Sequence, residues 1–460
     1  MDAWVEQELA GGTFPERRLK SRLGRLLGDL GARIGGTLPM ACQDWAATKA
    51  AYRFFDNSRL DDGVILAGHV AATAARFAAV PGTALVLHDT TEFSFTRNTP
   101  DGVGHLSYVK GRHGTHTACG LLMHSSLAVT TGGVPLGLAA AQLWSRKGFK
   151  GTNARNRVIN ATTIPIGEKE SYRWLTNVTR SAGALGDPGR CVHIGDRGGD
   201  IFELFHAAHA ARTHFLVRTA VDRLAGQGRT TVAKAMRRQP VRGTHQVEVR
   251  DDHGNVSMAT VQVRFCRLTI HPSPAKRKRY GPLPLTVIHA IERGRPTDRE
   301  PIRWKLLTDL PVDDLATAVE KLDWYAMRWK IESFHKVLKS GCRAEQSKLR
   351  TTARLTNLLA VLRVVGWRVF WLTMTGRATP DAPPEVAFTP AEIAVLDTIT
   401  GGPTDTAERT VSHYLGEVAK LGGDLARASD PPPGNMVVWR GLTRLADLLR
   451  GYELNAGGCG

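Results

Sequence analysis

Residues 325–339 read YAMRWKIESFHKVLK, and this segment carries its polar side chains at helical spacing. At about 100° per residue, five of them fall within an arc of roughly 80°: Tyr325, Arg328, Glu332, Lys336 and Lys339. Four apolar side chains lie on the other side and predict a buried face: Met327, Ile331, Phe334 and Leu338. The segment therefore predicts one helix that presents a single carboxylate among three cations. An ion-pair ladder on a solvated helix is the simpler interpretation of the same pattern.

Two aspartates end short apolar segments that are typical of buried strands. Thr83–Asp89 reads TALVLHD, and Cys191–Asp196 reads CVHIGD. An acid at a strand end is common, and Asp196 also fits a turn in which Asp200 caps the next helix. Together with Glu332, however, the two aspartates supply the oxygen ligands that Mg²⁺ prefers. Two such ions about 4 Å apart activate a water or a 3′-hydroxyl and stabilise the leaving oxygen of a phosphodiester.

The rest of the chain divides by its pattern into further parts. Residues 1–70 are helical and basic, and they predict a small DNA-binding unit, although an ordinary helical cap fits almost as well. Extended segments joined by a hairpin at Gly132-Gly133 predict a mixed-sheet α/β core over residues 71–375. Within this core, residues 213–310 predict a β-rich insertion. Residues 376–460 predict a linker rich in Pro and Ala, followed by a C-terminal helical domain.

Composition and charge narrow the class of protein. The 460 residues include 61 Lys and Arg against 43 Asp and Glu, a formal net charge of +18. Such a surplus favours a polyanionic partner, first of all nucleic acid, and a basic surface without a partner is the alternative. The six cysteines lie far apart, which argues against a zinc site and against a disulfide framework. No apolar run reaches the roughly 18 residues of a membrane span, so we expect a protein of the reducing cytoplasm.

The spacing Tyr325-x2-Arg328-x3-Glu332-x6-Lys339 resembles, without a gap, the signature of the insertion-sequence-four family of bacterial DDE transposases. Neighbouring motifs agree with this resemblance: His88-Asp-Thr-Thr91, Gly195-Asp-Arg197 with Asp200, and Arg328-Trp-Lys-Ile-Glu-Ser-Phe-His-Lys336. The similarity runs from the N-terminal helices to about residue 370. It implies a ribonuclease-H-like core, interrupted by the β-rich insertion, that holds the catalytic and metal-binding triad Asp89, Asp196 and Glu332.

The resemblance also implies residues that bind DNA. Tyr325, Arg328, Lys336 and Lys339 would contact phosphates at the transposon end. Trp304 is placed like a tryptophan that stacks on a base flipped out beside the cleavage point, although a tryptophan buried in a strand is the simpler interpretation. The list of expected DNA contacts is completed by two arginines, Arg218 and Arg197.

The expected activity is cut-and-paste DNA transposition with two Mg²⁺ ions, for which Mn²⁺ is expected to substitute. The resemblance implies cleavage through a 3′-hydroxyl and a hairpin intermediate, followed by strand transfer. The expected partners are double-stranded DNA (terminal inverted repeats and target) and a second copy of the chain, paired through the C-terminal tail. We expect a bacterial, cytoplasmic, nucleoid-associated protein and no membrane partner. Two alternatives remain: a nuclease with the same core that never joins ends, and a non-catalytic DNA-binding relative.

Overall fold

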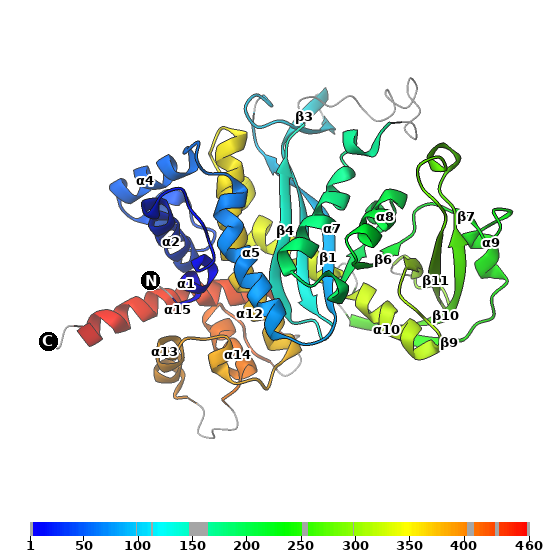
Figure 1. Ribbon diagram of the computed structural model, residues 1–460. Coiled ribbons are helices and arrows are strands. Elements are labelled where there is room, and N and C mark those ends of the chain that lie inside the picture. Colours follow the sequence, from blue (N-terminus) through cyan, green and yellow to red (C-terminus); the bar gives the residue numbers. More distant parts are fainter. Residues whose placement is uncertain are drawn as a thin grey trace.

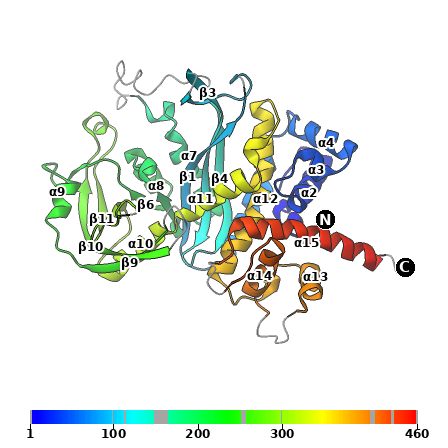
Figure 2. The same cartoon turned by 180° about the vertical axis from the view of Figure 1, so that it is seen from behind.

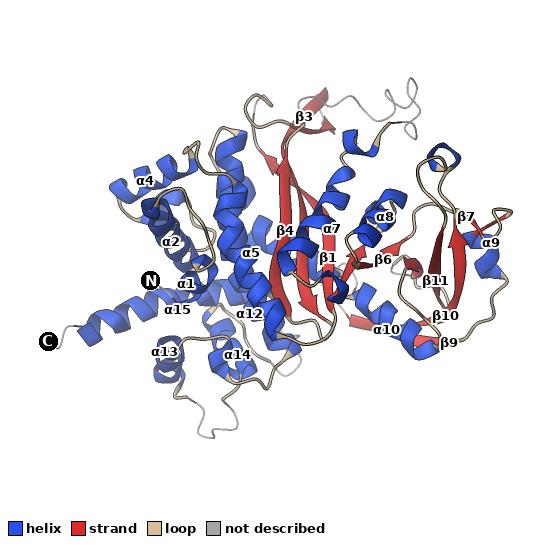
Figure 3. Ribbon diagram, viewed as in Figure 1, coloured by secondary structure: helices blue, strands red, loops and turns tan. Residues whose placement is uncertain are grey.

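The structure is a computed structural model that describes residues 3–97, 99–111, 114–146, 164–250, 256–297, 299–402, 409–427 and 432–457. A mixed sheet lies at the centre of the molecule, and helices from both ends of the chain lie together on one side of it (Figure 1). The strands of the insertion lie on the opposite side, as the colouring by secondary structure makes clear (Figure 3). The expected mixed α/β fold with N-terminal and C-terminal helices is confirmed.

Five helices form the N-terminal part: α1 Ala3–Leu9, α2 Arg17–Ala32, α3 Leu38–Cys42, α4 Trp45–Phe55 and α5 Asp62–Ala79. α4 begins where it does because the Asp44 carboxylate accepts hydrogen bonds from the backbone N–H groups of Ala46 and Ala47, at 2.8 and 3.1 Å. The helical prediction for residues 1–70 is confirmed, and the last of these helices continues past residue 70.

Five strands form the core sheet in the order β4-β3-β1-β5-β6: β1 Ala84–Phe95, β3 Gly114–Thr130, β4 Pro135–Trp144, β5 Cys191–Gly195 and β6 His214–Arg218. β3 is antiparallel to both β4 and β1, whereas β5 is parallel to both β1 and β6. β2, His105–Gly111, extends the sheet along the first half of β3. Gly133, at φ +84°, turns the chain from β3 into β4, as the hairpin motif predicts. This order is consistent with a ribonuclease-H-like core.

Helices cover both faces of the core sheet. α7 (Tyr172–Leu185) and α8 (Phe202–Ala210) lie over one face in Figure 1, and Figure 2 shows α11 (Trp329–Lys336) crossing the other. Successive side chains of a strand point to opposite faces. Asp89 of β1 therefore points to the face covered by α11, whereas its neighbour His88 points to the face covered by α7.

The insertion continues the core sheet with the elements β7 Leu224–Ala225, β8 Thr230–Thr231, α9 Val232–Arg237, β9 Gly243–Arg250, β10 Val256–Ile270, β11 Leu283–Glu292 and β12 Arg303–Thr308. β12 pairs antiparallel with β6 and joins the two regions in one sheet. The sequence placed residues 213–310 in the insertion, but β6 at their start lies beside β5 in the core. The reason is burial, because Phe215, Leu216 and Val217 are packed between the two neighbouring strands and the helices.

The charged segment does not form the single helix that its spacing predicts. α10 (Leu315–Ala326) ends before α11 begins, and a π-helical turn, Val337–Gly341, follows. The backbone N–H groups of Lys330 and Ile331 bond to carbonyl oxygens only three residues earlier, so a tighter turn interrupts the helix. As a result Tyr325 is only 4% exposed and does not share one solvated stripe with the cations.

The C-terminal part contains α12 Thr352–Ala378, α13 Pro390–Thr400, α14 Val411–Leu421 and α15 Asn435–Gly457. α12 is the one helix among the described residues that is long and apolar enough to cross a membrane, but 89% of its most apolar window is buried inside the protein. It is therefore a core helix, and it continues through residues 376–378, where the sequence predicted a linker.

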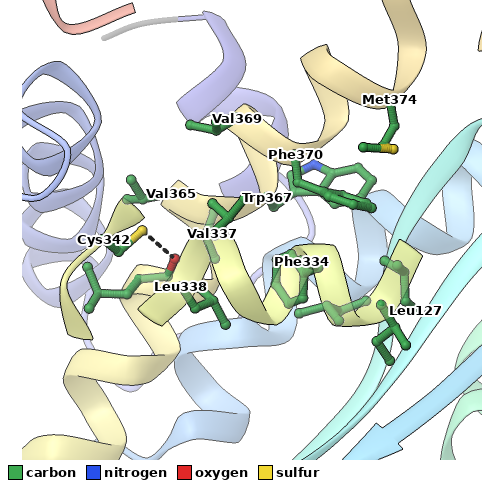
Figure 4. Packing of buried hydrophobic residues seen from close by; sticks show 14 of the residues in the cluster. Leu127, Phe334, Val337, Leu338, Cys342, Val365, Trp367, Val369, Phe370 and Met374 are labelled. Atoms are coloured by element: carbon green, nitrogen blue, oxygen red, sulfur yellow. Dashed lines mark hydrogen bonds between the residues drawn. The ribbon is translucent and has the colours of Figure 1, made fainter. Parts of the chain in front are cut away.

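α12 packs against the segment that carries the charged residues (Figure 4). Phe334 of α11 meets Phe370 of α12 edge to face, with ring centroids 5.7 Å apart. A side chain at Gly366 would place its Cβ 2.8 Å from Leu338, so the close approach of the two elements requires glycine there. This packing holds α11 in a fixed position over β1.

Short 3₁₀ turns complete the fold: Ile166–Glu168, Pro188–Arg190, Arg197–Gly199, Pro274–Lys276, Ala344–Gln346 and Pro384–Val386. One continuous hydrophobic cluster joins the N-terminal helices, one face of the sheet, α12 and the C-terminal helices. The Trp439 indole N–H of α15 also donates to the Ile34 carbonyl oxygen at 2.8 Å, just after α2. The two ends of the chain thus share a core with the sheet.

Candidate active site

Asp89 and Asp196 lie close to each other along neighbouring parallel strands. In the β1–β5 register Leu87 is opposite Ile194. Asp89 follows Leu87 by two positions, and Asp196 follows Ile194 by two positions. The Asp196 carboxylate accepts a hydrogen bond from the backbone N–H of Gly198 at 2.8 Å, which fixes the turn after β5. β1 continues beyond Asp89, which therefore lies within its strand and not at the strand end that the sequence predicted, whereas Asp196 directly follows β5. The Asp89 side chain is 18% exposed. The β1–β5 register places the two acids at neighbouring positions, where β5 ends.

Arg328 lies between Asp89 and Glu332. Its guanidinium forms an ion pair with Glu332, and its Nη1 atom is 3.8 Å from Oδ1 of Asp89. Burial opposes the charge of Arg328, but Glu332, Tyr325 and Asp89 together outweigh it and raise the pKa of the guanidinium above its usual value. The two acids therefore share one internal cation. The Glu332 side chain is 52% exposed and is free to change partner.

The three acids offer the donor chemistry of a magnesium site. Carboxylate oxygens are the hard ligands that Mg²⁺ and Mn²⁺ take, and the guanidinium beside Asp89 and Glu332 shows that these acids already hold a positive charge. Within the described residues, no three or more His, Cys, Asp or Glu side chains are grouped so that they could hold a metal ion. The arrangement explains this, because Glu332 is turned toward Arg328. By donor chemistry the residues fit divalent cations, provided that Glu332 leaves the arginine.

Three of the expected DNA-binding residues meet beside the acids. Trp304 of β12 and Tyr325 of α10 pack edge to face, with ring centroids 5.1 Å apart. Arg218, at the end of β6, hydrogen-bonds to the Tyr325 side chain. Burial raises the pKa of the Tyr325 phenol against the lowering effect of Arg328 and Arg218, and Asp196 adds to the rise. The phenol is therefore neutral, a hydrogen-bonding group among charged ones.

The remaining expected cations lie on the elements that carry the acids. Lys339, in the π-helical turn, has its Nζ atom 5.9 Å from the centroid of the Phe93 ring on β1. Lys336 is exposed on α11, and Arg197 is exposed in the turn directly after Asp196. Their positions leave both side chains available to a ligand at the surface.

The sequence analysis missed His335, which lies one turn after Glu332. Its Nδ1 atom is 3.3 Å from Oδ2 of Asp89, and its Nε2 atom is 3.3 Å from Oγ of Ser125. Ser125 is in turn the register partner of Asp89 across the β1–β3 pair. On a helical wheel His335 falls only about 20° outside the polar arc. This position near the polar arc could have indicated a role for His335, but the residue lies outside the arc itself and next to the apolar side of the helix.

A second group of histidines lies on the opposite face of β1. Nε2 of His88 is 2.8 Å from Nδ1 of His193, and the Thr90 hydroxyl is 2.8 Å from Nδ1 of His124. Burial lowers the pKa of His124 and of His193 to about 3, and it lowers that of His88 as well. These rings are therefore neutral at physiological pH. This group could not be predicted from the sequence, because its members come from three separate strands.

Asp200 has a structural role that differs from the helix cap considered from the sequence. Its buried carboxylate accepts hydrogen bonds from the backbone N–H groups of Ala220 and Val221, at 2.7 and 2.9 Å, and forms an ion pair with Arg223. The N-cap of α8 is instead Ile201. Asp200 thus fixes the loop that follows β6.

The N-terminal helices match a known family. Residues 1–60 match the family model described as Transposase DNA-binding. This part of the chain is therefore similar to the DNA-binding domain of transposases. Its helix α4 presents four exposed side chains on one face, Trp45, Lys49, Tyr52 and Arg53, and Trp45 is 77% exposed. Aromatic and cationic groups together suit a nucleic-acid surface. The match supports DNA as a partner and a transposase as the class of protein.

Proposed function

We propose that this protein is a cut-and-paste DNA transposase of the DDE type, with Asp89, Asp196 and Glu332 as its catalytic residues. The observation that supports this most is the arrangement of Asp89 and Glu332 around one cation, beside Asp196, in a chain whose first 60 residues match the transposase DNA-binding family. The resemblance of residues 325–339 to the insertion-sequence-four signature supports the same conclusion.

The three carboxylates would hold two Mg²⁺ ions, or Mn²⁺ in their place. Bound divalent cations would supply Lewis-acid activation of the attacking oxygen and neutralise the charge on the leaving oxygen. The protein's contribution is rigid placement of the ligands. Asp89 is held in the sheet, Asp196 is held by its hydrogen bond to Gly198, and the helix that carries Glu332 is held by its packing on α12.

The cations around the acids would bind the DNA backbone. A phosphate has the charge and hydrogen-bonding geometry to replace the Glu332 carboxylate as the partner of Arg328. That exchange would free Glu332 to turn toward the two aspartates. Lys336, Lys339 and Arg197 would add phosphate contacts, and these sequence-independent contacts would make binding strongly dependent on salt.

Trp304, Tyr325 and Arg218 would support a hairpin step. Water would first cleave the phosphodiester at the transposon end and release a 3′-hydroxyl, which would attack the opposite strand. Bending that strand requires an unstacked base with a new aromatic partner, and Trp304 is only partly buried. A second water would open the hairpin, and the freed 3′-hydroxyl would attack target DNA. Each step exchanges one phosphodiester oxygen for another.

We further propose a homodimer that pairs two transposon ends. α15 extends beyond the body of the molecule (Figures 1 and 2), and its last turns expose Leu448 and Tyr452 to 41% and 45%. This apolar surface would be covered by the second copy. As a transposase, the protein would act in the cytoplasm, associated with the nucleoid.

The proposed function is tested by a joining assay on DNA that carries the element's terminal repeat. The protein is incubated with Mg²⁺, the labelled repeat end and a target plasmid, beside the variants Glu332→Gln and Asp381→Asn. Asp381 is an exposed acid away from the site and serves as the matched control. Transposition predicts hairpin ends and plasmid joined to the repeat, both lost in Glu332→Gln and retained in Asp381→Asn.

The same assay separates the two alternatives. Cleavage without any joined plasmid would identify a nuclease and contradict the transposase. Salt-sensitive binding of the repeat without cleavage would identify a DNA-binding relative and contradict the catalytic assignment.

A further inference from the structure

His335 contacts Asp89, one of the proposed catalytic acids, and is 4% exposed. It connects α11 to the sheet twice, through Asp89 on β1 and through Ser125 on β3, each at 3.3 Å. Asp89 and Ser125 are register partners on one face of the sheet. The imidazole therefore spans a short bridge whose two ends are fixed relative to each other by the backbone.

The two contacts place the ring nitrogens of His335 toward different partners. Nδ1 faces Oδ2 of Asp89, and Nε2 hydrogen-bonds to Oγ of Ser125. The other carboxylate oxygen of Asp89, Oδ1, lies on the side of Arg328, 3.8 Å from its Nη1 atom.

We propose that His335 is a positioning residue that orients the Asp89 carboxylate for a divalent cation. This inference rests on the proposed function. A carboxylate contacted at one oxygen presents the other oxygen in a preferred direction, and loss of such an outer partner of a metal ligand costs 10- to 100-fold in metal affinity in other proteins. Ser125 holds the far side of the ring by a hydrogen bond of 3.3 Å, and the packing of Phe334 on Phe370 of α12 holds the helix that carries His335.

Two substitutions of similar size test the two contacts of His335 one at a time. The side-chain amide of Asn overlays Nδ1 of histidine, so His335→Asn keeps a donor toward Asp89. The amide of Gln overlays Nε2, so His335→Gln keeps a group toward Ser125 and loses the donor toward Asp89. If the ring merely fills space, the two variants bind a divalent cation equally tightly. If the ring orients the carboxylate, the Asn variant binds the cation more tightly than the Gln variant.

The test measures Mn²⁺ binding to the full-length protein without DNA, by titration calorimetry and by electron paramagnetic resonance. We expect the dissociation constant to rise about 10- to 100-fold in His335→Gln and His335→Ala, and by less than about threefold in His335→Asn. His209→Gln, an exposed histidine at the end of α8, is the control and should bind as the wild type does. Thermal unfolding of each variant shows that it is folded.

Three outcomes would overturn the inference, and they differ in what else they affect. Equal Mn²⁺ affinity in the Asn and Gln variants would overturn the positioning role and leave the proposed function standing. Nitrogen hyperfine coupling on the bound Mn²⁺ would make His335 a direct ligand. If the wild type binds no Mn²⁺, or binds it no more tightly than Asp89→Asn does, the proposed function is overturned together with this inference.

Discussion

At the scale of single residues, Arg328 is the group on which the state of the site depends. Its guanidinium pairs with Glu332 and stands 3.8 Å from Asp89, where positive charge would otherwise come from a metal ion. Under the proposed function, an arginine that contacts both acids would compete with divalent cations in the absence of DNA. When DNA binds, the same side chain would gain a phosphate partner. Arg328 would therefore have opposite effects on metal binding and on DNA binding.

Replacing Arg328 by Gln should strengthen metal binding to the free protein and weaken catalysis. Removal of the internal cation should lower the Mn²⁺ dissociation constant by ~3- to 10-fold, the range of a partly exposed ion pair. End cleavage should fall by about 100-fold or more, because a phosphate contact made during reaction is lost. Calorimetry and single-turnover cleavage measure the two effects. Arg180→Gln, on the exposed side of α7, is the control, and weaker Mn²⁺ binding in Arg328→Gln would contradict this account.

Asp200 supports the site without taking part in it. Replacing it by Ala leaves the backbone N–H groups of Ala220 and Val221 without their acceptor and removes the ion pair with Arg223, which keeps its hydrogen bond to the backbone carbonyl oxygen of residue 200. We expect a loss of about 3 kcal/mol in the free energy of unfolding, measured in urea. Asp187→Ala, at an exposed turn, should change it by less than about 0.5 kcal/mol. An Asp200→Ala protein as stable as the control would show that the loop after β6 does not depend on this acid.

At the scale of elements, local patterns predicted some parts of the fold and tertiary contacts decided others. β1, β5 and the β3–β4 hairpin followed from apolar runs and a glycine pair, which are signals within a few residues. The break between α10 and α11 was not predictable, because the spacing of residues 325–339 fits one helix equally well. β6 was assigned to the insertion for the same reason, since its place beside β5 is a long-range pairing.

The candidate site shows the same limit. The acids Asp89, Asp196 and Glu332 were predicted from motifs, although Asp89 was expected at a strand end and lies within β1. His335 was missed because its partners, Asp89 and Ser125, are distant in the sequence and come together only through the β1–β3 register. Buried Tyr325 was expected on a solvated face, and the turn before α11 moved it inward.

The histidines between β1 and α7 predict how stability depends on pH. The pKa of His193 is about 3 in the folded protein, against an ordinary value of 6.5, because the ring is buried. Between these values the unfolded chain binds a proton that the folded chain does not. The contribution of His193 to the free energy of unfolding is therefore fully present above about pH 6.5, and it is lost as the pH is lowered toward 3.

Replacing His193 by Gln should remove one titrating group from this dependence. The slope of the unfolding free energy between pH 6 and pH 4 should decrease by about 1.4 kcal/mol per pH unit. Urea unfolding at several pH values measures the slope, and His209→Gln, an exposed histidine, should leave it unchanged. An unchanged slope in His193→Gln would show that this ring is protonated in the folded protein.

At the scale of the whole molecule, the DNA-binding domain is built into the body of the protein. Its helices share one hydrophobic cluster with the sheet, α12 and the C-terminal helices. α1 is held by Glu8, whose carboxylate contacts Nδ1 of His69 on α5 at 2.5 Å and Arg76 at 3.0 Å. Under the proposed function, a domain fixed in this way would present DNA to the candidate site in one orientation.

Trp439 tests this coupling between the two ends of the chain. It is 7% exposed, and its indole N–H bonds to Ile34. Trp439→Ala should cost about 3–5 kcal/mol in unfolding free energy, and binding of the terminal repeat should weaken because α2 loses its support. Trp439→Phe keeps most of the packing, so its unfolding free energy and its binding of the repeat should decrease much less. Hydrogen exchange over α2 and a binding titration measure both effects, and unchanged exchange in Trp439→Ala would refute the coupling.

The central claim is that Asp89, Asp196 and Glu332 form one catalytic site on DNA. The most direct measurement is single-turnover cleavage of a terminal-repeat duplex in Mg²⁺ by Asp89→Asn, Asp196→Asn and Glu332→Gln, with DNA affinity measured in parallel. We predict that each variant binds the repeat within about threefold of the wild type and cleaves it at least ~1,000-fold more slowly. If any one of the three cleaves at close to the wild-type rate, that acid is not catalytic and the proposed site is wrong.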